Sequence, residues 1–168
     1  MMKALIAACF MLGLCSCSNT TPSGFWKTYR AKNLKEDKSN QGSQVGYRVM
    51  YWKAAQGAFT SKEIISYAEK NNWKIVDSIE VEAMDMNNWT YNGKPIFPLT
   101  HEGFSVKSLN SSVHNNFPRW ISDGSKVYMF KTSWLVIEPG TNESNDMNGF
   151  VLLNNDGSEM SVYHIWGE

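Results

Sequence analysis

Residues 126–137 read KVYMFKTSWLVI and would be apolar on both faces of an extended chain. Successive side chains of a strand point to opposite faces of the sheet. One face would carry Tyr128, Phe130, Trp134 and Val136, and the other Val127, Met129, Leu135 and Ile137. A strand that is apolar on both faces is covered on both. This stretch therefore predicts a central β-strand between two packed layers.

Turn signals divide the chain around this strand. Asn-Gly and Asp-Gly pairs favour tight turns, because both residues accept positive φ angles. The pairs are Asn92-Gly93, Asp123-Gly124 and Asp156-Gly157. The last third of the chain then separates into apolar runs at about 117–122, 126–138, 149–154 and 158–166. Four short runs with turn residues between them predict an antiparallel meander.

The middle of the chain adds one helix and two more strands. Thr60 and Glu63 form a capping box before an apolar helical pattern, which predicts a helix at about 61–71. Residues 45–53 and 73–82 alternate as strands do. The predicted fold is a single α+β domain, with an antiparallel meander sheet of about five to seven strands and this one main helix packed on it.

The first residues indicate export. Lys3 precedes an apolar run at 4–14, which is too short for a helix that spans a membrane. The run ends in Leu14-Cys15-Ser16-Cys17, which resembles the lipobox of bacterial lipoproteins. The resemblance implies cleavage before Cys17 and acylation of its thiol, for example by palmitate. Residues 1–16 would be the signal peptide, 17–24 a lipidated cysteine with its tether, and 25–168 the domain.

Two alternatives to this assignment remain open. Cys9 follows Ile6-Ala7-Ala8, a second acceptable match, but few apolar residues precede it. The apolar run could instead be a buried helix of the fold. If cleavage occurs before Cys17, no free thiol remains for catalysis or metal binding.

The residues after Cys17 bear on location. Ser18 stands where an aspartate retains many lipoproteins in the inner membrane, so we expect the outer membrane, facing the periplasm. A segment rich in basic and aromatic residues follows at 25–38. It could contact anionic headgroups, or form a short solvated helix with its aromatic side chains packed on the domain.

Composition excludes several partners. The chain has 16 basic and 16 acidic residues, and loss of Lys3 leaves the mature protein with a net charge of −1. It has no basic excess for a nucleic acid and no glycine-rich loop for a nucleotide.

His101, Glu102 and His114 are weak metal candidates because their spacing matches no known ligand motif. We expect no cofactor, and place His164 on the polar side of its strand.

Aromatic residues are the most unusual feature of the composition, with 7 Trp, 7 Tyr and 8 Phe. Trp89, Tyr91 and Trp120 lie beside turns and could form an exposed binding shelf, or fill the core. The leading hypothesis is a non-catalytic lipoprotein that binds an envelope or incoming protein, as an inhibitor, immunity protein or envelope accessory. The alternatives are a glycan-binding module that uses this shelf, and a hydrolase that uses His101 and Glu102.

Overall fold

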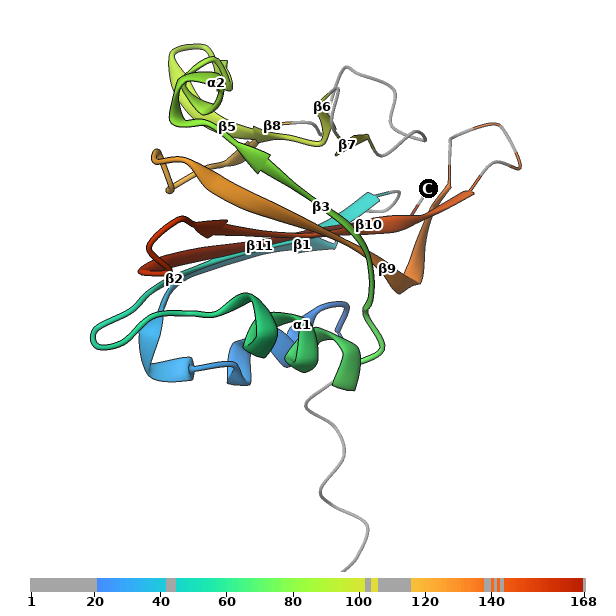
Figure 1. Cartoon of the computed structure of the whole chain (residues 1–168). Helices are drawn as coiled ribbons and strands as arrows, with labels where there is room; N and C mark the ends of the chain where they lie inside the picture. The colour runs from blue at the N-terminus through green and yellow to red at the C-terminus, as the bar shows by residue number, and fades with distance from the viewer. Residues whose placement is uncertain are drawn as a thin grey trace, which may run out of the picture.

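The protein is built on a six-stranded sheet with the strand order β1-β2-β11-β10-β9-β3, in which all neighbours are antiparallel (Figure 1). The computed structural model describes residues 21–41, 45–101, 104–105, 116–137, 140, 142 and 144–167. The strands are β1 (Leu34–Gln41), β2 (Val45–Lys53), β3 (Lys74–Val81), β9 (Ser125–Ile137), β10 (Ser144–Asn154) and β11 (Glu159–Gly167). Only β9, β10 and β11 follow one another as a meander, because β2 lies beside β11.

Shorter elements cover the two faces of the sheet, as Figure 1 shows. One face carries η1 (Gly24–Thr28), η2 (Ala31–Asn33) and α1 (Ser61–Lys70). The other carries α2 (Ala83–Asn87), β4 (Thr90–Tyr91), β5 (Lys94–Pro98) and β8 (Asn116–Pro118). A two-stranded pairing joins β6 (Thr100–His101) to β7 (Phe104–Ser105). The described chain is mostly β, and its longest helix, α1, has only ten residues, so the predicted α+β class is supported only in part.

Local sequence signals explain where α1 and the β4–β5 turn form. The Thr60 side chain accepts a hydrogen bond from the backbone N–H of Glu63, and the helix begins directly after Thr60. Asn92 and Gly93 have φ angles of 50° and 73°, as their turn requires. The predicted helix and hairpin are confirmed, and α1 packs on the sheet through Ile64 and Ala68.

The strand predicted at 126–138 forms as β9 and is covered on both faces over residues 127–130, as predicted, but it does not lie at the centre of the sheet. β9 lies next to the edge strand β3, and the innermost strands are β11 and β10, which are buried along most of their length. The alternation of buried and exposed residues along β9 also breaks, because the register between β9 and β10 shifts between Asn145 and Gly149. Trp134 and Leu135, which lie at this shift between the paired residues Lys131 and Val136, are exposed, whereas Val136 is buried.

Two separate cores lie on the two faces of the sheet. The core beneath α2 and the small strands contains Trp89, Phe97, Phe150 and Tyr163 among its members. The core beneath α1 is richer in tryptophan and holds Trp26, Trp52 and Trp73. The aromatic residues that stood out in the composition therefore mostly fill these cores.

Candidate functional site

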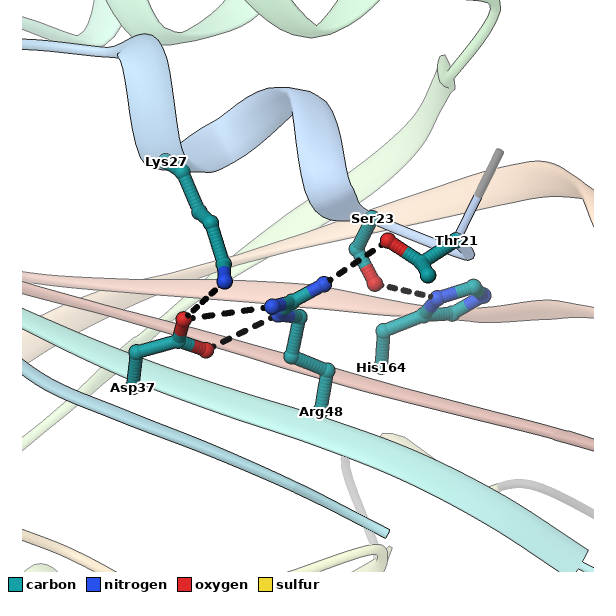
Figure 2. Close-up of polar contacts among 6 residues, drawn as sticks. All are labelled: Thr21, Ser23, Lys27, Asp37, Arg48 and His164. Atoms are coloured by element: carbon teal, nitrogen blue, oxygen red, sulfur yellow. Dashed lines mark hydrogen bonds and ion pairs between the residues drawn. The ribbon is translucent and has the colours of Figure 1, made fainter. Parts of the chain in front are cut away.

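A buried polar cluster holds the first described residues against the sheet. We call residues 21–28 the entry segment, and Figure 2 shows how it is fixed. Ser23 Oγ lies 2.7 Å from His164 Nδ1, and Thr21 Oγ1 accepts a hydrogen bond of 3.2 Å from Arg48. Ser23 has a φ of 55°, a left-handed conformation that L residues rarely adopt, and it precedes η1. The chain thus turns onto the domain earlier than predicted, since Pro22, Ser23 and Gly24 of the expected tether are buried.

The second ring nitrogen of His164, Nε2, is also hydrogen-bonded inside the protein. Its Nε2 lies 3.2 Å from Thr132 Oγ1, which is 2.9 Å both from Asn148 Oδ1 and from the carbonyl oxygen of Trp134. The one hydroxyl hydrogen of Thr132 goes to one of these two acceptors, so its oxygen accepts from Nε2–H of His164. Nδ1 is then the acceptor of the Ser23 hydroxyl. Every polar atom of the imidazole is therefore satisfied inside the protein.

Burial keeps this imidazole neutral. Only 1% of His164 is exposed, and the rings of Trp73 and Trp166 both lie 5.0 Å from its ring. Desolvation by burial lowers the pKa of His164 from 6.5 to about 3. A serine beside a histidine can act as a nucleophile and its base. Here Ser23 is also buried, so as built the pair fixes the entry segment and presents no nucleophile to solvent.

We predict that this histidine makes folding sensitive to acid. Between about pH 6.5 and 3 the unfolded chain binds a proton at His164 that the folded protein does not. The free energy of unfolding should therefore fall as the pH drops through that window, by about 1.4 kcal/mol per pH unit from this one group. Urea unfolding at several pH values between about 4.5 and 6.5 measures the slope.

The variant His164→Gln is the control, because an amide can still hydrogen-bond with Ser23 and Thr132 but does not titrate. Its slope should be smaller than that of the unsubstituted protein by nearly one proton. Equal slopes would show that His164 is not the group responsible. Asp37, whose pKa is lowered below 3.8, contributes only at more acidic pH.

An ion cluster reinforces the entry segment next to this site. Arg48 donates to both carboxylate oxygens of Asp37, at 2.9 and 3.1 Å, and Lys27 Nζ lies 2.8 Å from the same carboxylate. Partial burial by itself raises the pKa of Asp37, but these hydrogen bonds and charges outweigh it, so the pKa is lowered. Both cations have a carboxylate partner, so the cluster is no free anion site. The basic and aromatic segment forms η1, η2 and β1, where a short solvated helix was one expectation.

A second cluster fixes the opposite face of the sheet. We call α2, β4, β5 and β8 the hairpin lobe. Arg119, buried beside it, donates to the carbonyl oxygens of Met86 at 2.9 Å and Ile96 at 3.1 Å, and also to that of Ile121. Burial lowers the pKa of its guanidinium, and the described part of the chain provides no ion pair for it. One side chain thus joins α2, β5 and the segment after β8.

The lobe exposes two large apolar side chains. Met84 on α2 is 76% exposed and Tyr91 on β4 is 55% exposed. Beneath them Met86 and Trp89 are buried in the core. The lobe therefore presents apolar side chains outward from a backbone that Arg119 and this core hold in place.

The predicted aromatic shelf is not formed as one surface. Trp89 is buried and packs edge-on against Phe97, with 6.0 Å between ring centroids. Trp120 is half-buried and stacks on Tyr51 at 5.4 Å, with Lys38 Nζ 5.4 Å from its ring centroid. Of the three aromatic candidates, only Tyr91 is strongly exposed.

Most of the remaining candidate residues lie outside the part of the chain that the structure describes. Cys17, Glu102 and His114 lie outside the described residues, and only the backbone of His101, in β6, is described. Within the described residues no group of three or more His, Cys, Asp or Glu side chains could hold a metal. The metal and hydrolase hypotheses therefore gain no support from the part of the chain that is described.

Sequence reasoning missed the polar residues that the structure makes prominent. The expectation that His164 lies on a polar side is wrong, because β11 is buried on both faces from Met160 to Trp166. Its neighbours Val162, Tyr163, Ile165 and Trp166 were a signal that both faces are apolar. Arg48 and Arg119 gave no local signal, since their partners are distant in sequence or are backbone carbonyls.

No family model, curated protein or solved structure matches this chain. Among the described residues, no helix is long and apolar enough to cross a membrane.

Proposed function

We propose that the protein is a lipoprotein held by acylated Cys17 in the outer membrane, facing the periplasm, and that its domain binds another protein without catalysis. The observation that carries this proposal is that two fixed features, the entry segment and the hairpin lobe, lie on opposite faces of the sheet. The entry segment is locked onto the face that carries α1, and the hairpin lobe exposes Met84 and Tyr91 on the other face (Figure 1).

The entry segment supports close attachment to the membrane. Only residues 18–20 separate Cys17 from Thr21. A fully extended chain spans at most about 3.6 Å per residue, so Cys17 lies within about 14 Å of Thr21. Acyl chains on that cysteine would hold the face with the entry segment near the bilayer and turn the hairpin lobe away from it.

The hairpin lobe supports protein binding. Tyrosine and methionine are enriched at protein interfaces, and a rigid surface loses little conformational entropy when it binds. Arg119 supplies that rigidity by joining Met86, Ile96 and Ile121. The sealed Ser23–His164 pair supports a role without catalysis, because substrate could reach it only if the entry segment detached.

Affinity capture tests the proposal. The mature protein, tagged at its C-terminus and extracted from membranes in mild detergent, should retain one envelope protein in stoichiometric amount. The double variant Met84→Asp, Tyr91→Ser should lose that protein, because it removes the exposed apolar side chains from the centre of the proposed interface.

Val76→Ser is the matched control, because it removes an exposed apolar side chain from β3, outside the hairpin lobe. It should retain the partner. A protein that captures nothing, or a partner that stays bound to the double variant, would contradict the proposal.

A further inference from the structure

We infer that Trp134 and Leu135 of β9 insert into the membrane interface beside the lipidated cysteine, so that the domain contacts the bilayer directly as well as through its lipid. This inference rests on the proposed attachment through Cys17. It adds a defined orientation and a second point of contact with the same bilayer.

The two side chains are unusually exposed for their type. Trp134 is 45% and Leu135 46% exposed, next to each other in a strand whose preceding residues 127–130 are buried. Both lie between Lys131 and Val136, where the pairing of β9 with β10 is irregular and three consecutive residues, 133–135, are exposed. This irregular segment therefore presents two adjacent apolar side chains to solvent. Tryptophan is enriched at membrane interfaces because its ring is apolar and its N–H is polar.

Their position is next to the membrane attachment. Trp134 and Ser133 line the same hollow, of about 280 Å³, as Thr21 and Ser23 of the entry segment. Cys17 lies within about 14 Å of Thr21, by the length of the chain between them. The acyl chains must therefore enter the bilayer close to the end of β9. A lipid surface is the occupant that this geometry brings to Trp134 in every copy of the anchored protein.

Charge around the hollow favours an anionic surface. Lys70 lines it, and Lys74 lies opposite Lys131 in the pairing of β3 with β9. Lys131 is paired with Asp146 at 3.3 Å, whereas Lys70 and Lys74 have no ion pair within the described chain. Lysines near an anionic lipid surface are attracted to its headgroups.

The backbone at Trp134 is already satisfied, which allows it to approach lipid. Its N–H donates to Thr132 Oγ1 at 3.1 Å, and its carbonyl accepts from Asn148 Nδ2 at 2.6 Å. Unsatisfied backbone groups oppose entry into an apolar phase. Thr132 and Asn148 of the buried polar cluster therefore hold the backbone of Trp134 in place.

Quenching by brominated lipid tests the contact. The mature lipidated protein is reconstituted in vesicles of phosphatidylethanolamine and phosphatidylglycerol, with and without bromine on the acyl chains. Bromine should quench part of the tryptophan fluorescence, and Trp134→Phe should remove most of that quenched component. Trp120→Phe is the matched control, because Trp120 packs against the core on the other face of the sheet. It should leave the quenched component unchanged.

A second variant, Leu135→Asp, should reduce the quenching of Trp134, since a carboxylate opposes insertion into the apolar part of an anionic bilayer. Equal quenching in the unsubstituted protein and Trp134→Phe would overturn the inference. The mass of Cys17 is measured on the same samples, which separates the two proposals. Lipid on Cys17 without quenching of Trp134 contradicts the contact alone, whereas the absence of lipid contradicts the attachment and the contact together.

Discussion

Replacing Arg119 with methionine is expected to lower the free energy of unfolding by about 3 kcal/mol or more. Methionine fills much of the space of the arginine stem but donates no hydrogen bond. The carbonyl oxygens of Ile96 and Ile121 would lose the guanidinium as their donor, whereas that of Met86 keeps the backbone N–H of Trp89. Each buried group left unsatisfied costs about 1–3 kcal/mol. Urea unfolding of the chain from Ser18 onward measures the change.

Two further variants sharpen this test. Arg119→Lys keeps a cation but cannot reach three carbonyls with one ammonium group, so it should also destabilise the protein. Arg30→Met is the control, because Arg30 pairs with Glu63 where both are partly exposed, and its loss should cost less than about 1 kcal/mol. Equal stability of Arg119→Met and the unsubstituted protein would show that the lobe does not depend on this side chain.

Replacing Trp73 with alanine is expected to have a comparable or larger effect, about 3–5 kcal/mol. Its indole is buried against Trp26, Phe130 and His164 at 5.7, 5.7 and 5.0 Å. Gly149 packs so closely that a Cβ placed there would lie 2.7 Å from the Trp73 ring. The cavity would remove these contacts and admit water beside the imidazole.

A second consequence distinguishes this variant from an ordinary core defect. Water beside His164 would reduce the desolvation that lowers its pKa, so that the pKa would rise towards 6.5. Stability should then depend less steeply on pH below about 6.5 than in the unsubstituted protein. Trp134→Ala, at an exposed tryptophan, is the control and should change neither property strongly. An unchanged pH slope in Trp73→Ala would contradict this account of the His164 pKa.

Local signals in the sequence predicted the elements that depend on neighbouring residues. The capping box of Thr60 and Glu63 places the start of α1, and Asn92-Gly93 places the turn between β4 and β5. Alternation located β3 and β11 to within a few residues. Such features are readable because the interacting groups lie a few residues apart.

Features that depend on distant residues were not predictable in this way. β1 is mostly exposed and charged, and only its pairing with β2 makes it a strand. Ser23 and His164 are 141 residues apart, and the buried state of each depends on the other. The exposure of Trp134 accompanies a register shift between β9 and β10, with the extra residues on β9, and the apolar pattern of β9 alone does not reveal this shift.

The lipid anchor is tested by the intact mass of the protein purified from membranes, followed by the mass of its N-terminal peptide. We expect residues 1–16 to be absent and Cys17 to be the first residue, with a diacylglyceryl group on its sulfur. A chain that retains Met1, or that begins with an unmodified residue, would contradict the lipid anchor and the orientation derived from it.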